Sequence, residues 1–256
     1  MTEIKWDFSG KTALISGAAS GMGLLCAQCF AQAGGNVVMT DINREMLDKC
    51  VEEINRKGAG KAIGVICDVR DYEQVCAARD AAVEAFGSID LLTNFAGGAE
   101  TRMLGVNGGQ EFPDIPIEVY DWGLDVNLKG QFYFAHAVLK QMREQKSGVI
   151  INLGSITGEE GSANNVAYST AKSAAMNGLT KSLAQYGSKY GIRCCCVAPG
   201  PVLTRAAMAN MKTALGRAAD PQEIVDIILY LASEKGAFMT GITILSDGGR
   251  HFMPHK

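Results

Sequence analysis

The chain has 256 residues, with 24 Lys and Arg against 27 Asp and Glu and a formal net charge of −3. This near balance argues against an electrostatic grip on nucleic acid or on an anionic membrane as the main activity. Hydrophobic residues make up 47% and charged residues 20%, which is typical of a globular protein and excludes a disordered chain. No apolar run approaches the roughly 18 residues of a membrane span. Because residues 1–10 lack the apolar stretch of a signal peptide, we expect a cytoplasmic protein with reduced thiols.

The eight cysteines do not form a metal-binding pattern. Cys26 and Cys29 fit C-x-x-C, and residues 194–196 are three consecutive cysteines. A zinc site usually needs a second such pair or histidines at a matching distance, and the three histidines stand in no such arrangement. We therefore predict no metal site and no disulfide, and interpret the cysteines as small buried side chains.

Short apolar runs alternate with amphipathic segments along the chain. The runs predict strands over residues 11–16, 36–40, 61–66, 89–93, 149–152, 192–197 and 242–245. The segments predict helices over residues 21–33, 43–57, 71–86, 117–145, 165–190 and 221–233, the fourth broken near Asn127. Residues 97–116 look irregular. This alternation predicts a Rossmann-like α/β fold, a doubly wound parallel sheet of about seven strands with helices on both faces, in one domain over residues 1–256.

A glycine-rich turn joins the first predicted strand to the first helix. Gly17, Gly21 and Gly23 give the spacing G-x-x-x-G-x-G, which differs from the more common G-x-G-x-x-G. Such a turn lets the backbone approach a pyrophosphate and aims the free N–H groups of the helix at it. A purely structural turn would use the same residues. There is no Gly-Lys-Ser/Thr, so the P-loop interpretation fails.

An acidic residue, Asp41, ends the second predicted strand. A carboxylate at this place can accept hydrogen bonds from the adenosine ribose diol and would repel a 2′-phosphate. Neither Ile42 nor Ser20 offers a cation for that phosphate, and we expect Arg44 to face solvent. The sequence therefore favours NAD over NADP, although Asp41 could instead serve only as a helix cap.

Tyr168 and Lys172 lie four residues apart in a predicted helix and so share a face. An ammonium group beside a phenol lowers its pKa from the ordinary value of about 10, which suits proton exchange with an alcohol. The spacing alone is weak, because a solvated helix face produces it by chance. Ser155 strengthens it, because it follows the fifth strand at the carboxyl edge of the sheet, where such folds bind ligands.

In these motifs the sequence resembles the short-chain dehydrogenase/reductase family over essentially its whole length. Further motifs carry the resemblance in chain order: residues 67–69 (CDV), 94–97 (NFAG), 125–128 (DVNL), 199–204 (PGPVLT) and 247–249 (DGG). Phe95 departs from the second Asn of the family's Asn-Asn-Ala-Gly, and we expect this change to alter packing rather than chemistry.

The resemblance implies hydride transfer between nicotinamide C4 and a carbinol carbon. It implies Tyr168 as general acid/base, Lys172 lowering its pKa, Ser155 binding the substrate oxygen, and Asn127 holding a water that links Lys172 to solvent. The implied cofactor-binding residues are Gly17, Ser20, Gly21, Met22, Gly23, Asp41, Ile42, Asp68, Val69, Asn94, Ala96, Gly97, Tyr168, Lys172, Pro199, Gly200, Val202 and Thr204. Purely structural roles stay open for Asp68 and Thr204 as helix caps and for Asn127 as a packed polar group.

The substrate is less defined by the sequence. The segment between Thr204 and Gly216, which the family uses as a lid, is short. Polar candidates for the pocket wall are Glu100, Arg102, Asn107, Gln110, Thr157, Glu159, Glu160, Asn164 and Asn165, and apolar candidates are Met103, Leu104, Met208 and Met211. The polar set slightly favours a small hydroxy compound such as a sugar, polyol or hydroxy acid, although a solvated rim would look the same. A hydroxysteroid or a 3-oxoacyl substrate is the alternative.

Two expectations concern function class and assembly. A catalytically silent NAD-binding sensor or scaffold would carry a damaged Ser–Tyr–Lys set, whereas here the set is intact. The resemblance implies a homotetramer or homodimer built on the helices predicted near residues 131–145 and 165–190. Small residues there would allow close approach of helices across an interface, and would equally suit packing on the sheet.

Overall fold

The seven predicted apolar runs form one parallel sheet. The computed structural model describes residues 5–57, 59–103, 105 and 111–253, with the side chains of residues 102 and 103 left out. The strands are β1 (Thr12–Ser16), β2 (Asn36–Asp41), β3 (Ala62–Ile66), β4 (Leu91–Asn94), β5 (Gly148–Leu153), β6 (Ile192–Pro199) and β7 (Thr243–Ser246). Their order in the sheet is β3-β2-β1-β4-β5-β6-β7, and every neighbouring pair is parallel. The order reverses between β1 and β4, where such sheets bind ligands.

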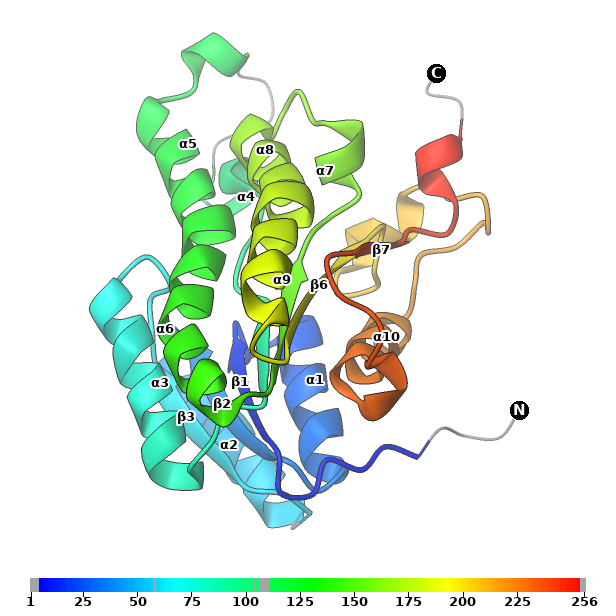
Figure 1. Cartoon of the computed structure of the whole chain (residues 1–256). Helices are drawn as coiled ribbons and strands as arrows, with labels where there is room; N and C mark the ends of the chain where they lie inside the picture. The colour runs from blue at the N-terminus through cyan, green and yellow to red at the C-terminus, as the bar shows by residue number, and fades with distance from the viewer. Residues whose placement is uncertain (1–4, 58, 104, 106–110, 254–256) are drawn as a thin grey trace.

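Helices cover both faces of this sheet (Figure 1). One face packs against α1 (Gly21–Gln32), α2 (Arg44–Lys57) and α10 (Pro221–Ala232), and the other against α3 (Tyr72–Phe86), α6 (Gly130–Gln145) and α9 (Thr180–Ser188). Because successive strand residues point to opposite faces, Ala13 and Ile15 of β1 join the first layer and Leu14 joins the second. The predicted doubly wound Rossmann-like fold is confirmed.

Two long helical regions each contain a π-helical turn. In the first, α5 (Ile117–Leu124) continues through η2 (Asp125–Lys129) into α6, so the predicted break near Asn127 is confirmed. The side-chain amide of Gln131 donates to the backbone carbonyl of Asn127 (2.6 Å) and takes the place of the regular helical bond. In the second, α8 (Val166–Ala174) passes through η3 (Ala175–Leu179) into α9, with the Thr180 hydroxyl donating to Ala175 O. The continuous helix predicted over 165–190 is wrong at this turn.

Several short elements lie in regions where the sequence predicts none. They are α4 (Glu100–Met103), η1 (Phe112–Asp114), α7 (Thr157–Glu160), η4 (Ala206–Asn210), η5 (Glu234–Gly236) and η6 (Arg250–Phe252). Each is too short to show the helical period in sequence. Among the described residues, no helix is both long and apolar enough to span a bilayer.

The second layer depends on Phe134 of α6, which is fully buried. We expect Phe134→Ala to lower the free energy of unfolding by about 3–5 kcal/mol, because it leaves a cavity in a close-packed core. Phe132→Ala is the matched control on the same helix, because that ring is about half exposed (51%). Urea unfolding of both variants tests this, and equal losses would contradict the assignment of Phe134 to the core.

Candidate active site

A cavity of about 470 Å³ opens at the carboxyl ends of the central strands. It collects the residues that follow β1, β2, β3 and β4, together with the start of α1. Twelve of the predicted cofactor-binding residues line it: Gly17, Ser20, Gly21, Met22, Gly23, Asp41, Ile42, Asp68, Val69, Ala96, Gly97 and Thr204. Sequence reasoning missed six further lining residues, namely Cys67, Arg70, Phe95, Trp122, Val126 and Arg205.

The glycine-rich turn is shaped to leave room at the start of α1. A Cβ on Gly17 would lie 2.7 Å from Ala96 N, and one on Gly23 would lie 2.2 Å from Gly17 O. At Gly21 (φ +56°) a Cβ would meet only the Thr204 methyl, at 4.0 Å, so the space in front of this backbone is open. These are the features of a cradle in which free N–H groups at a helix N-terminus face an anion. The residues present therefore fit a dinucleotide pyrophosphate.

Asp41 stabilises this turn as well as lining the cavity. One carboxylate oxygen accepts from Ala19 N (3.1 Å) and the other from Asn43 N (3.0 Å), so the side chain joins the end of β2 to the turn after β1. Asn43, not Asp41, caps α2 by accepting from Met46 N. Arg44 is exposed, as expected. The alternative role of Asp41 as the cap of α2 is therefore wrong.

Two arginines that the sequence analysis did not place at the dinucleotide site, Arg70 and Arg205, line this cavity. Arg70 forms a bidentate pair with Asp68, in which Nε donates to one carboxylate oxygen (3.0 Å) and Nη2 to the other (2.6 Å). The guanidinium hydrogen bonds lower the pKa of Asp68. The cap of α3 is Asp71, which accepts from Glu73 N and Gln74 N, so the alternative role of Asp68 as that cap is wrong.

Asn127 fixes the loop that follows β4. Its side-chain oxygen accepts from Gly98 N (3.0 Å), and its amide donates to Gly98 O and to Gly123 O (2.9 Å each). A Cβ on Gly97 would lie 2.5 Å from this oxygen. Beneath the loop, the buried Asn94 donates to Asn152 on β5. The side chain of Asn127 thus holds the backbone of the loop in place. The main-chain carbonyl of Asn127, which the π-helical turn frees, accepts from the Gln131 amide.

Tyr168 and Lys172 lie on the first turns of α8, as predicted. Lys172 is buried, with its ammonium 5.6 Å from the centre of the Tyr168 ring. The ammonium donates to Leu153 O (2.8 Å) at the end of β5. Burial lowers the pKa of Lys172 to about 8, because the charged form is desolvated. Tyr168 is half-buried.

Ser155 follows β5 and is buried, with its oxygen held by Thr157. The Thr157 N–H donates to Ser155 Oγ (3.3 Å), and the two hydroxyl oxygens lie 2.9 Å apart. Thr157, which the sequence analysis placed at the pocket wall, is therefore hydrogen-bonded to Ser155 through both its backbone N–H and its hydroxyl. These bonds use acceptor positions of Ser155 Oγ and leave its proton for donation to another oxygen.

Gln131 is a buried residue of this region that sequence reasoning missed. Its amide donates to Asn127 O (2.6 Å) and to Leu153 O (3.2 Å), and its oxygen accepts from Leu153 N. The carbonyl that receives the Lys172 ammonium is therefore held by Gln131 from α6. A polar residue on the apolar face of an amphipathic helix is the sequence signal for such a role.

Two acidic residues predicted in the substrate pocket are bound to protein groups instead. Glu100 is fully buried and accepts from the N–H groups of Ala167 and Tyr168. Glu160 forms an ion pair with Arg250 (2.9 Å). The predicted role of Glu100 in the pocket wall is wrong, because this carboxylate is fully buried against backbone N–H groups. The place of the partly exposed Glu160 at the pocket wall stays a prediction. Glu159 and Asn164 are exposed, and Asn165 is half-buried.

The segment after Thr204 is short and mostly exposed. It contains η4, with Met208 and Met211 half-buried, and Arg250 donates to Lys212 O (3.1 Å) near its end. Thr204 does not cap η4, since Arg205 occupies the cap position. Pro199, Gly200 and the buried Val202 lie at the end of β6 and the turn beyond it. Leu104, Asn107 and Gln110, and the side chains of Arg102 and Met103, lie outside the described residues.

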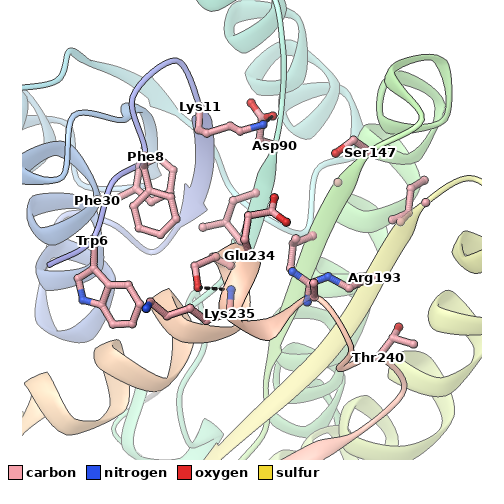
Figure 2. Close-up of a pocket in the computed structure, with 18 of the residues that line it drawn as sticks. Trp6, Phe8, Lys11, Phe30, Asp90, Ser147, Arg193, Glu234, Lys235 and Thr240 are labelled. Atoms are coloured by element: carbon pink, nitrogen blue, oxygen red, sulfur yellow. Dashed lines mark hydrogen bonds and ion pairs between the residues drawn. The ribbon is translucent and has the colours of Figure 1, made fainter. Parts of the chain in front are cut away.

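A larger cavity of about 820 Å³ opens at the opposite edge, where β1, β4, β5 and β6 begin (Figure 2). Three of its charged groups are engaged in structural contacts. Lys11 pairs with Asp90 (3.1 Å), and the Arg193 guanidinium donates to Leu231 O and Met239 O. None of the predicted catalytic or cofactor-binding residues lines it. The chemistry suggested by the sequence belongs to the carboxyl edge.

The comparisons with known proteins agree with this geometry. A family model described as enoyl-(acyl carrier protein) reductase matches residues 17–251. The trans-4-hydroxycyclohexanecarboxylate dehydrogenase of Sinomonas cyclohexanicum is 39% identical, over 97% of this chain and 96% of its own length. A 3-oxoacyl-[acyl-carrier protein] reductase from Brucella melitensis, crystallised with bound NAD, superposes with a TM-score of 0.88 at 31% identity, covering 99% of this chain and 98% of that one.

An NAD⁺-bound xylitol dehydrogenase superposes with a TM-score of 0.84 at 29% identity, covering 94% of this chain and 99% of that one. The fold, the ordered motifs and these matches together define the class. The chain belongs to the short-chain dehydrogenase/reductase family of oxidoreductases. The resemblance inferred from the sequence is confirmed.

The burial of Lys172 predicts a pH-dependent stability. Between pH 8 and the ordinary lysine value of about 10.4, the unfolded chain binds a proton that the folded chain has lost, so stability rises with pH. We compare the free energy of unfolding of the wild type with that of Lys172→Met. The difference between them should rise by up to about 3 kcal/mol in favour of the wild type across this pH range, and should stay constant below pH 8.

Urea unfolding of the cofactor-free proteins at several pH values measures this difference. Lys181→Met, which removes an exposed lysine farther along the same helical region, is the control and should give a flat difference. A flat difference for Lys172→Met as well would contradict a desolvated ammonium.

Proposed function

We propose that the protein is an NAD-dependent oxidoreductase that interconverts a secondary alcohol and a ketone. The observations that carry this proposal are the Tyr168–Lys172 pair on α8, whose ammonium binds Leu153 O at the end of β5, and Ser155, which follows the same strand on the side of the sheet where the dinucleotide cradle opens. A bound nicotinamide would supply the hydride acceptor for oxidation, or the hydride donor for reduction. In this proposal the protein's own groups bind the substrate oxygen and move its proton.

Each polar residue has a defined part in this chemistry. Tyr168 takes the hydroxyl proton of the alcohol as general base, and returns one to the ketone oxygen in the reverse direction. Ser155 donates to the same oxygen, since Thr157 uses its acceptor positions. The Lys172 ammonium favours the phenolate form of Tyr168 and is positioned by Leu153 O. Asn127 holds the loop after β4 in place.

The remaining predicted residues would hold the dinucleotide. The turn from Gly17 to Gly23 would receive the pyrophosphate, and Asp41 the adenosine ribose. Asp68 and Val69 would lie against the adenine, and Asn94, Ala96 and Gly97 would border the ribose–nicotinamide part. The end of β6 and the turn beyond it would approach the nicotinamide through Pro199, Gly200, Val202 and Thr204.

NAD is the better fit than NADP. The Asp41 carboxylate at the end of β2 would repel a 2′-phosphate, and Arg70, one of the two arginines that line the cavity, is paired with Asp68. Two of the similar solved structures contain bound NAD. The intact Ser–Tyr–Lys set favours an enzyme over a silent NAD-binding scaffold.

The substrate we propose is a small hydroxylated compound, such as a hydroxy acid or polyol. Among the relatives, one is named for a hydroxycyclohexanecarboxylate and another for xylitol. A 3-oxoacyl compound is the second candidate, favoured by the match to a 3-oxoacyl reductase and by the half-buried Met208 and Met211 in the segment after Thr204. We further propose a homotetramer or homodimer acting in the cytoplasm.

We expect Tyr168→Phe to abolish turnover while leaving cofactor binding intact, because it removes the proton carrier and keeps the ring. The loss should be about 10²-fold or more in kcat. A panel of secondary alcohols with NAD⁺ identifies the substrate, and NADH fluorescence titration measures binding. Retained turnover in this variant would show that the proton comes from another group.

We expect Asp41→Ala to weaken NAD⁺ use and relax the preference against NADP⁺. Loss of the carboxylate removes both the ribose acceptor and the repulsion of the 2′-phosphate, so the ratio of the two kcat/KM values should change by about 10-fold or more. Asp48→Ala, on the exposed side of α2, is the control. A wild type that prefers NADP⁺ would overturn the cofactor assignment.

A further inference from the structure

The helix that carries Tyr168 begins on a buried carboxylate. Glu100 is fully buried (0% exposed), and its two oxygens accept from Ala167 N (3.0 Å) and Tyr168 N (3.1 Å), in the first turn of α8. Asn165, the residue in the cap position, makes no side-chain cap bond. The start of α8 is therefore capped from outside, by a residue 68 positions away from Tyr168 in sequence.

The burial of Glu100 depends on close approach of α5. Gly123 lies against both α4 and α8, where a Cβ would meet Ala167 Cβ at 2.9 Å and Glu100 Cβ at 3.1 Å. Burial, and after it the charge of Glu100, raises the pKa of the neighbouring Tyr120. A carboxylate kept out of water is costly unless it is hydrogen-bonded and faces positive charge. Here the N–H groups of α8 supply the hydrogen bonds, and the helix dipole supplies the positive charge.

Two more contacts tie the same segment to the site. The Thr101 hydroxyl donates to Asn165 Oδ1 (2.6 Å), just before α8. At the other end of the segment, Asn127 binds both backbone groups of Gly98. The stretch from Gly98 to Thr101 therefore connects Asn127 to the start of the helix that carries Tyr168 and Lys172.

We propose that Glu100 is a positioning residue for the reaction, whose buried charged carboxylate fixes the first turn of α8 and sets the field in which Tyr168 exchanges its proton. This inference rests on the proposed function of Tyr168 as general acid/base. Glu100 touches the backbone of Tyr168 and acts through it. Its charge opposes that of Lys172, so the two buried groups act on the phenol in opposite directions.

Other charged groups on the elements packed against α8 are exposed or paired. Glu159 of α7 and Glu118 and Asp121 of α5 are exposed. Glu160 of α7 pairs with Arg250, and Asp125 of η2 pairs with Lys129. Among the described side chains of α4, α5, α7, η2 and η3, the titratable groups are Glu100, Tyr120, Glu118, Asp121, Glu159, Glu160, Asp125 and Lys129.

The test is Glu100→Gln, which keeps the size of the side chain and removes its charge. We expect kcat for alcohol oxidation to fall about 10-fold, because one of two cap bonds is lost, while the dissociation constant of NADH stays within about 2-fold. Without the negative charge the phenolate is more stable, so the rise of kcat with pH should move to lower pH by about half a pH unit or more.

Two matched variants separate charge from shape. Glu118→Gln removes an exposed carboxylate on α5 and should change neither kcat nor the pH profile. Glu100→Asp keeps the charge with a shorter reach, so kcat should fall and the pH profile should stay in place. Should Glu100→Gln fail to fold, an unmoved profile with lowered kcat in Glu100→Asp still supports the proposal, and an unchanged kcat there refutes it.

A second readout does not require turnover. The near-ultraviolet absorbance change on tyrosine ionisation, taken as the difference between each protein and its Tyr168→Phe version, reports the titration of Tyr168 alone. We expect this titration at lower pH in Glu100→Gln than in the wild type. An unmoved titration of Tyr168 in Glu100→Gln would overturn this proposal, even if the enzyme is active. If the titration of Tyr168 moves but the wild type oxidises no alcohol, the proposed function is refuted, whereas the electrostatic effect of Glu100 on Tyr168 is upheld.

Discussion

The buried ammonium group of Lys172 is the constraint around which the site is arranged. A cation in the interior requires acceptors, and the structure supplies Leu153 O at the end of β5. That carbonyl is in turn fixed by Gln131, which also closes the π-turn at Asn127. The sheet edge, the break in the long helix and the charge on α8 are therefore one connected arrangement. Its consequence is that the phenol of Tyr168 lies beside a positive charge whose own pKa is near 8.

Most of this framework could be predicted from the sequence, because it follows from local patterns. Apolar runs of four to eight residues mark buried strands, and glycine spacing together with Asp41 marks the turn after β1. The break near Asn127 was predicted as well. The four residues proposed for catalysis share the carboxyl side of the sheet because each follows or faces the end of β4 or β5.

The polar groups that support this framework could not be predicted, because their partners, backbone atoms or the side chain of Arg250, reach them only when the chain is folded. In the sequence, Glu100 and Glu160 look like solvated loop residues. Only the fold shows that α8 packs against Glu100 and that the C-terminal segment places Arg250 beside Glu160. The role of Gln131 depends on a carbonyl freed by a π-turn, which has no sequence signature of its own. Residue type alone suggests exposure for all three. Packing against backbone groups buries Glu100 and Gln131, whereas the ion pair with Arg250 holds Glu160.

The central claim is that a nicotinamide binds beside Tyr168, Ser155 and Lys172 at the carboxyl edge of the sheet. A crystal structure of the protein with NAD⁺ tests it most directly. The account predicts the pyrophosphate on the turn from Gly17 to Gly23, the adenosine ribose on Asp41, and the nicotinamide ring in contact with the side chains of Tyr168 and Lys172. A dinucleotide bound elsewhere, for example in the cavity where the strands begin, would contradict it.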